Sequence, residues 1–235
     1  MMECGANVQL NPLEIDEGEL LARYEKLYTA VVYDVLMMEL GVFAVLPTDL
    51  LPLSDGMKVC GIAFTVKGMS NCSIPEQKRE QEHQRRARLM QSMYQNNIVV
   101  WDTSHDRGNA QFGEMMTAGS ILHGSKGAVV DGGIRDTDRI LETGYCIWSR
   151  YRTPASMYNR HEIVTWQIPV KIGQVEVFPG DIVFADMDGI VVVPRRLACR
   201  VLIRSEELQK TERGWREILS SGVALSEYVD EGGKF

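Results

Sequence analysis

The feature that most constrains the fold is a unit of apolar strand, polar loop and helix that occurs twice in succession. The units comprise residues 98–101, 102–109 and 115–123, and then residues 127–130, 131–136 and 137–142. Units in this order place their loops at the carboxyl ends of the strands, where the binding sites of α/β proteins tend to lie. The sequence therefore predicts an α/β fold with a candidate site in these two loops.

The other segments predict helices at both ends of the chain and further strands between them. Residues 13–40 have helical spacing of apolar side chains, with a second apolar run that opens at Thr29, and residues 195–219 predict a long amphipathic helix. Alternation between Asp55 and Gly68 predicts a strand pair, and residues 163–193 predict an uninterrupted β region with tight turns. Because no low-complexity linker divides the 235 residues, we expect one domain over 1–235.

Composition and charge restrict the classes of partner. The chain has 25 Lys and Arg against 32 Asp and Glu, a net charge of −7 that disfavours binding to a phosphate backbone. No apolar stretch approaches the roughly 20 residues that span a bilayer, and the first residues lack a secretion signal. Its five cysteines form no C-x-x-C pair. We therefore expect a cytoplasmic protein with small-molecule or protein partners, and neither a nucleic acid nor a membrane partner.

The first loop leads into a helix that can receive an anion. No phosphate-binding loop, dinucleotide fingerprint, nucleophile elbow or H-E-x-x-H motif is present, which excludes nucleotide hydrolysis and zinc peptidase chemistry. Gly113 precedes the helix, so the unpaired N–H groups of its first turn can bind a carboxylate. Glu114 adds a negative charge beside them.

The second loop holds Arg135 and Asp136, preceded by two glycines that allow close approach of a ligand or a neighbouring backbone. A guanidinium binds a carboxylate or enolate in bidentate fashion, and a carboxylate suits Mg2+ or Mn2+. In the alternative interpretation Asp136 caps the next helix and Arg135 pairs with Asp131 or Asp138. The residues alone favour this alternative, because capping aspartates are common.

A polar helix is expected to begin at Pro75. Basic and acidic side chains alternate along it: Arg79, Arg85, Arg86 and Arg88 with Glu76, Glu80 and Glu82. This pattern is typical of a solvated helix face, here one that borders a pocket. The four histidines are scattered and share no ligand spacing, so none is assigned a catalytic role.

Several motifs together resemble the RraA-like family, which contains class II 4-hydroxy-4-methyl-2-oxoglutarate (4-carboxy-4-hydroxy-2-oxoadipate) aldolases and regulators of ribonuclease E activity. They are Gly113-Glu114, D-G-G-I-R-D at 131–136, P-G-D at 179–181, D-M-D-G followed by four apolar residues and proline at 186–194, and a G-x-A-x-T-V strand within 59–68. The resemblance extends from about Thr29 to Arg216. It favours the functional interpretation of Arg135 and Asp136 over capping.

The resemblance implies a swivelling three-layer β/β/α domain that assembles as a homotrimer or homohexamer, with active sites between subunits. It implies that Arg135 binds the pyruvyl oxygens, that Asp136 holds Mg2+ or Mn2+, and that Glu114 acts through metal-bound water. The backbone amides of Met115 and Met116, next to Gly113, would hold the substrate carboxylate.

A glutamate from the C-terminal helix of a neighbouring subunit is also implied at the site. Glu212 fits best by its offset from Pro194, and Glu206 and Glu207 are the alternatives. Glu212 would complete a metal and catalytic set with Glu114 and Asp136.

The activity implied by the resemblance is a divalent-metal-dependent aldolase, a lyase that cleaves a 4-hydroxy-2-oxo acid to pyruvate, with oxaloacetate decarboxylation as a second activity. The segment 69–96 and the neighbouring subunit would then select the leaving half of the substrate. The alternative is a non-catalytic regulator that binds a ribonuclease or another protein.

Overall fold

The computed structural model describes residues 10–71, 76–220 and 222. Its strands are β1 (Leu51–Pro52), β2 (Val59–Ser70), β3 (Asn97–Asp102), β4 (Ala110–Phe112), β5 (Gly127–Ile134), β6 (Cys146–Arg152), β7 (His161–Trp166), β8 (Val170–Ile172), β9 (Val175–Val177), β10 (Ile182–Ala185) and β11 (Ile190–Val193). Its helices are α1 (Glu17–Tyr24), α2 (Thr29–Asp34), α3 (Glu76–Gln91), α4 (Glu114–Leu122), α5 (Thr137–Thr143) and α6 (Ala198–Ser220). The expected helix start at Pro75 and the Arg79 side chain lie outside the described residues.

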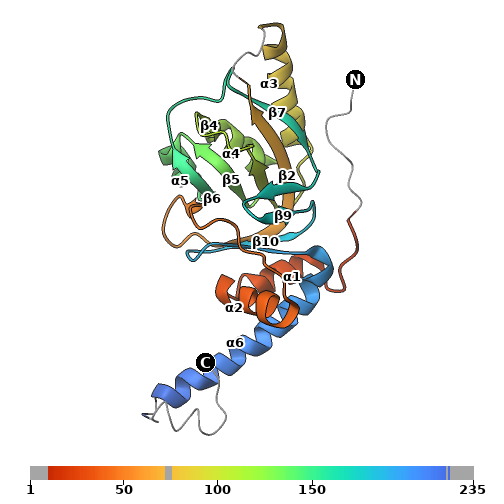
Figure 1. The fold of residues 1–235 in the computed structure, drawn as a ribbon, viewed down its shortest axis with the longest axis vertical. Helices are drawn as coiled ribbons and strands as arrows, with labels where there is room; N and C mark the ends of the chain where they lie inside the picture. The colour runs from red at the N-terminus through yellow and green to blue at the C-terminus, as the bar shows by residue number, and fades with distance from the viewer. Residues whose placement is uncertain (1–9, 72–75, 221, 223–235) are drawn as a thin grey trace.

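The centre of the main sheet is parallel, as the repeated unit predicts. Strands β6, β5, β3 and β2 lie side by side in that order and run in one direction, whereas β10, β11, β7 and β1 join antiparallel. Helices α3, α4 and α5 connect the parallel strands and cover one face of the sheet (Figure 1). The loops that follow β3 and β5 therefore lie at one edge, which confirms the predicted α/β arrangement.

Two predictions for the strands were wrong in detail. Residues 59–68 form no strand pair but one strand, β2, whose first eight residues are buried and therefore lack a solvated turn. Strand β5 continues through Ile134, so most of the expected loop 131–136 is sheet. Gly132 and Gly133 admit neighbouring side chains here, since a Cβ on them would lie 2.3 Å from Gln111 Oε1 and 2.5 Å from Tyr151 Cε2. The sequence interpretation also missed β1, β4 and β6.

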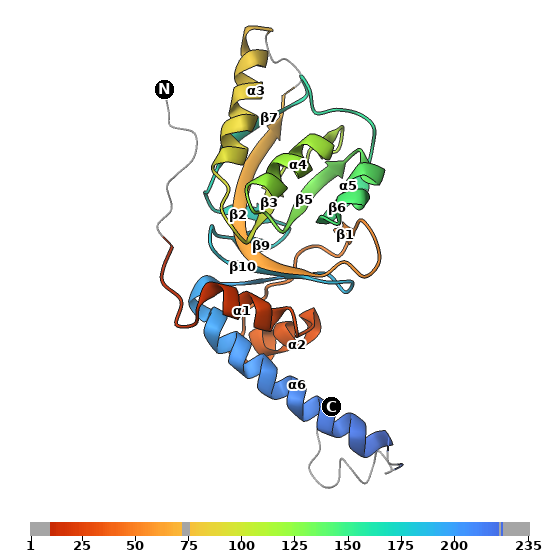
Figure 2. The same ribbon diagram turned by 180° about the vertical axis from the view of Figure 1, so that it is seen from behind.

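Three hydrophobic clusters divide the described chain into layers, which agrees with the expected β/β/α domain. One cluster packs α3, α4 and α5 on β2, β3 and β5. A second lies on the opposite face, beneath the hairpin β8–β9 and strands β10 and β11. The third joins the outer side of β10 and β11 to α1, α2 and α6 (Figure 2).

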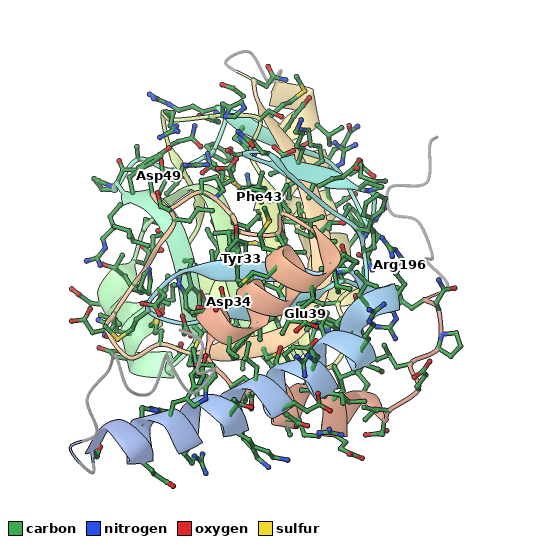
Figure 3. The ribbon with its side chains drawn as sticks, turned by 60° about the horizontal axis from the view of Figure 1, so that its bottom comes forward. Tyr33, Asp34, Glu39, Phe43, Asp49 and Arg196 are labelled. Atoms are coloured by element: carbon green, nitrogen blue, oxygen red, sulfur yellow. The ribbon has the colours of Figure 1, made fainter. Side chains whose placement is uncertain are left out.

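Both predicted terminal helical regions are present and pack together. Residues 13–40 form α1, α2 and a π-helical turn at Val35–Glu39, and α6 follows a 3-10 turn at Arg195–Leu197. Figure 3 shows α6 along the base of the molecule beside α2. Among the described helices, none combines the length and apolar character that a membrane span requires. Cys60, Cys146 and Cys199 are free thiols, and Cys4 and Cys72 lie outside the described residues.

Candidate functional site

Arg135 and Asp136 follow directly on the buried strand β5. The backbone N–H of Arg135 donates to the carbonyl of Phe112 (3.0 Å), so the pair is fixed against the end of β4. Asp136 adopts a left-handed backbone with φ of 56° and ψ of 36°, a conformation that is uncommon for residues other than glycine. Strained backbone of this kind is concentrated at functional sites.

The capping interpretation of this pair was wrong. The side chain of Asp136 forms no capping hydrogen bond with α5; its Oδ2 instead accepts one from the backbone N–H of Glu114 (3.2 Å). Arg135 Nε lies 3.4 Å from the same oxygen, whereas Asp131 pairs with Arg150. The two predicted loops therefore meet through Asp136, which lies across the N-terminus of α4.

Gly113 makes this contact possible. A Cβ at this position would lie 2.6 Å from Asp136 Oδ2 and 3.0 Å from Arg135 Cγ. Its backbone is extended (φ −158°), so glycine is needed here for space and not for a special conformation. Helix geometry leaves the next N–H groups, those of Met115 and Met116, without acceptors inside α4. They can therefore bind an anion beside Arg135.

A cavity of about 360 Å3 lies over these groups. Its lining includes the predicted residues Gly113, Met115, Met116, Arg135 and Asp136. The remaining lining residues are His83, Arg86, Ala87, Met90, Ala110, Gln111, Phe112, Ser156 and Met157. The cavity thus combines an apolar wall with two arginines and one carboxylate.

The predicted acidic residues are only partly brought together. Glu114 begins α4 beside Asp136 but does not line the cavity. The pKa of Arg139 on α5 is raised chiefly by its hydrogen bond to Glu142, and the charge of Glu114 adds to this effect. Within the described residues, no cluster of three or more His, Cys, Asp or Glu is positioned for a metal ion. Mg2+ needs only one or two protein carboxylates when substrate and water supply its other ligands. Asp136, exposed over 36% of its side chain, fits that role.

The C-terminal glutamates lie away from this cavity in the same chain. Helix α6 lies below strand β10, whereas α4 and α5 lie above it, on the other side of that strand (Figures 1 and 2). Glu212 accepts a hydrogen bond from the Tyr28 hydroxyl, Glu206 pairs with Arg23 (2.7 Å), and Glu207 pairs with Arg204 (2.8 Å). The role expected of Glu212 concerns a neighbouring subunit, and it stays a prediction.

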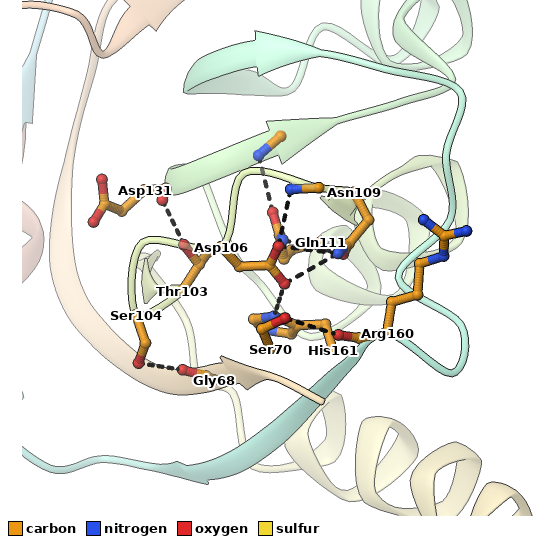
Figure 4. A network of polar contacts seen from close by, with 12 residues as sticks. Gly68, Ser70, Thr103, Ser104, Asp106, Asn109, Gln111, Asp131, Arg160 and His161 are labelled. Atoms are coloured by element: carbon orange, nitrogen blue, oxygen red, sulfur yellow. Dashed lines mark hydrogen bonds and ion pairs between the residues drawn. The ribbon is translucent and has the colours of Figure 1, made fainter. Parts of the chain in front are cut away.

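A buried polar network that sequence reasoning missed supports the first loop (Figure 4). His161 Nδ1 lies 2.8 Å from Asp106 Oδ2, and the Asn109 amide donates to both oxygens of that carboxylate. Gln111 Nε2 donates to Asn109, and Gln111 Oε1 accepts from the backbone N–H of Gly133 on β5. The network thus connects β7 to the strand that carries Arg135.

The charge state of this network follows from burial. Burial lowers the pKa of His161 and outweighs the opposing effect of Asp106, so the neutral ring donates its Nδ1 proton to that carboxylate. Burial alone would raise the pKa of Asp106, but hydrogen bonds from Gly108, His161 and Asn109 lower it overall. Because His161 and Asp106 are 55 positions apart in the sequence, no short motif could reveal the pair.

Comparisons with known proteins point to one family. The RraA-like family model, described as Aldolase/RraA, matches residues 29–192. A protein of Halalkalibacterium halodurans that carries the provisional name 4-hydroxy-4-methyl-2-oxoglutarate aldolase is 25% identical over 79% of this chain and 84% of its own length. The chain spans about three-fifths of several other curated relatives, and 28% of the larger Protein DlpA of Legionella pneumophila.

Two solved structures are similar over most of their length. A protein described among novel cellulases from gut microbes has a TM-score of 0.82 and 39% identity, with 88% of this chain and 91% of that chain covered. Streptomyces coelicolor RraAS2, described as an unusual member of the RNase ES inhibitor RraA family, has a TM-score of 0.73 and 27% identity, with 87% and 99% covered.

Proposed function

The chain belongs to the RraA-like family, and from that premise we propose that it is a divalent-metal-dependent lyase that cleaves a 4-hydroxy-2-oxo acid to pyruvate. One observation carries the proposal: Arg135 and Asp136 share a cavity with the N-terminus of α4. A guanidinium, a carboxylate and free backbone amides are the groups that binding a 2-oxo acid and a cation requires.

The reaction breaks a carbon–carbon bond and leaves its electron pair on the pyruvyl fragment. The transition state therefore develops negative charge on the 2-oxo oxygen, where a fixed positive group lowers its energy most. Arg135 provides that group from the end of a buried strand. The amides of Met115 and Met116 hold the neighbouring carboxylate and so orient the bond that breaks.

Asp136 is the residue that would hold Mg2+ or Mn2+, and a bound cation would polarise the 2-oxo group as a Lewis acid. Asp136 is itself positioned by the Glu114 N–H and by Arg135. The 4-hydroxyl proton must pass to a base, for which we propose Glu114 or Glu212 of a neighbouring copy. Because oxaloacetate yields the same enolate when it loses carbon dioxide, its decarboxylation is proposed as a second activity.

The test is pyruvate release from 4-hydroxy-4-methyl-2-oxoglutarate and from oxaloacetate, with Mg2+, with Mn2+ and with a chelator. Asp136→Asn is the sharpest variant, because asparagine also tolerates the left-handed backbone. Asp138→Asn removes the same charge two residues away, from an exposed position outside the cavity lining, and is the matched control. Turnover that persists in the chelator, or an Asp136→Asn variant as active as the control, contradicts the proposal.

Assembly as a trimer or hexamer belongs to the same proposal, since Glu212 can reach the cavity only from another copy. Native mass spectrometry of the purified chain checks it. A monomer with full activity would remove Glu212 from the mechanism.

A second candidate is a regulator that binds a ribonuclease, which similarity to the RNase inhibitor RraAS2 favours. It does not require the metal or Asp136. Inhibition of a purified ribonuclease E-type enzyme that is equal for wild type and Asp136→Asn, without pyruvate release, would support it.

One similar solved structure is described among novel cellulases, so glycoside hydrolysis is a further activity to compare with the geometry of the site. Most glycosidases place two carboxyl groups on either side of the bond that they cleave. Asp136 is the one acidic side chain among the described residues that line the cavity. The geometry therefore supports 2-oxo acid chemistry better.

A further inference from the structure

The cavity contains a second arginine that the mechanism does not use. Arg86 belongs to α3 and lines the same cavity as Arg135 and Asp136. Its Nε is fully buried and has no hydrogen-bond partner, and no ion pair to its guanidinium is present among the described residues. Buried donors in native proteins nearly always have a partner, so this one indicates a missing acceptor.

The neighbouring arginines on α3 are accounted for differently. Arg85 donates to the carbonyl of Ile163 on β7 (2.7 Å) and lies 3.5 Å from Glu82. Arg88 is exposed. The predicted solvated face is therefore correct for Arg88 and wrong for Arg86, which is turned into the cavity.

The surroundings of Arg86 leave its charge incompletely balanced. Burial lowers its pKa, the charge of Glu82 opposes this effect, and the nearby charge of Arg135 lowers it further. The cavity's carboxylate, Asp136, is already in contact with Arg135 and the Glu114 N–H. A partly buried guanidinium whose buried Nε has no hydrogen-bond acceptor favours an anionic ligand in the cavity.

We propose that Arg86 binds a second anionic group of the substrate, at the end opposite to the pyruvyl carboxylate. This assignment rests on the proposed function, in which Arg135 and the α4 amides hold the pyruvyl end. The lining of the cavity also includes the apolar side chains of Met90, Phe112 and Met116, which suit a short aliphatic carbon chain. Arg86 is then a specificity-determining residue that favours dianionic over monoanionic 2-oxo acids.

The experiment compares kcat/KM for 4-hydroxy-4-methyl-2-oxoglutarate with kcat/KM for 4-hydroxy-2-oxopentanoate, which lacks the distal carboxylate. Arg86→Met is expected to lower the ratio of the two values about 10- to 100-fold, the effect of one charged hydrogen bond. Arg88→Met removes the same charge from the same helix and is expected to leave the ratio unchanged. An unchanged ratio in Arg86→Met overturns the assignment, even if the enzyme is active.

A binding measurement separates this inference from the proposed lyase activity. If the wild type releases no pyruvate, the proposed function fails, and calorimetric titration with 2-oxoglutarate and 2-oxopentanoate in Mg2+ decides the role of Arg86 alone. If Arg86→Met binds 2-oxoglutarate more weakly than wild type but binds 2-oxopentanoate equally well, the assignment is supported. Equal weakening of both acids, or binding of neither by wild type, overturns it.

Thermal unfolding provides an independent check on the same variant. Since no hydrogen bond or ion pair to this guanidinium is present among the described residues, Arg86→Met is expected to unfold at the same or a higher temperature than wild type. A loss of selectivity accompanied by a lower unfolding temperature would instead indicate a structural role.

Discussion

Substitution of Gly113 by alanine tests whether the position of the Asp136 carboxylate matters. The added Cβ would lie 2.6 Å from Asp136 Oδ2, whereas ordinary contact begins near 3.4 Å, so the oxygen must retreat by about 0.8 Å. That shift breaks the hydrogen bond from the Glu114 N–H and also moves Arg135. A displacement of about 1 Å in a catalytic constellation can cost about 100-fold in rate, or about 2.7 kcal/mol in transition-state stabilisation.

The cost in stability should be much smaller. Alanine adopts the extended backbone of Gly113 without strain, and the Arg135 and Asp136 side chains are 40% and 36% exposed, so both can move toward solvent. We expect a loss of about 1 kcal/mol, which lowers the unfolding temperature by about 2–4 °C in a chain of this size.

A coupled assay of pyruvate release, together with thermal unfolding, measures both effects. Gly108→Ala is the matched control, because its Cβ would meet Asp106 Oδ1 at an ordinary 3.6 Å and Gly108 lies outside the cavity lining. If Gly113→Ala keeps kcat/KM within about threefold of this control, the reasoning that links the Asp136 position to the chemistry is refuted.

Three further predictions concern the support of the site. Gly68→Ala would place a Cβ 2.2 Å from His161 Nε2. We expect this overpacking to reduce the free energy of unfolding by about 1–3 kcal/mol and to lower the unfolding temperature by several degrees. An unchanged unfolding temperature would contradict this. Burial lowers the pKa of His161 in the folded chain, whereas in the unfolded chain the imidazole titrates near 6.5. The unfolded chain therefore binds a proton on His161 more tightly, and the free energy of unfolding should fall as the pH drops below about 6.5. His161→Gln should flatten that dependence in thermal unfolding between pH 7.5 and 5.5, and an unaltered slope would remove His161 as its cause. Glu212→Gln should reduce turnover at least about tenfold and leave the unfolding temperature unchanged. Glu206→Gln breaks the ion pair with Arg23 and should therefore change the unfolding temperature more than turnover. The reverse pattern would exchange the roles of the two glutamates.

Local sequence patterns were sufficient to predict the central strands of the parallel sheet and the helices that connect them. Apolar runs followed by polar loops and helices identified β3, β5, α4 and α5, because each such run is buried in a parallel sheet. The same reasoning failed at β2, where an apparent alternation was taken for a strand pair. The first eight residues of this strand are all buried, so the alternation did not mark a solvated face and did not reveal the length of the strand.

The site required information that no local pattern contains. Residues 114 and 136 are 22 positions apart, and the hydrogen bond between them depends on the left-handed backbone of Asp136, which spacing does not show. A capping aspartate was therefore the natural local interpretation, and the joint pattern of several motifs was needed to replace it. The interleaved charges of this helix likewise indicated a solvated face but did not show that Arg86, unlike the other arginines of α3 whose side chains are described, lines the cavity.

The cavity is lined partly by residues that follow strand β5 and partly by residues of helix α3, and this bears on how its ligand preference can change. Arg135 and Asp136 directly follow strand β5, which is paired with β3 on one side and β6 on the other, so the sheet fixes the position of their backbone. Four other lining residues, His83, Arg86, Ala87 and Met90, belong to the single helix α3 and take no part in strand pairing. Substitutions along that single helical face can therefore change which molecules the cavity accepts while Arg135 and Asp136 keep their positions.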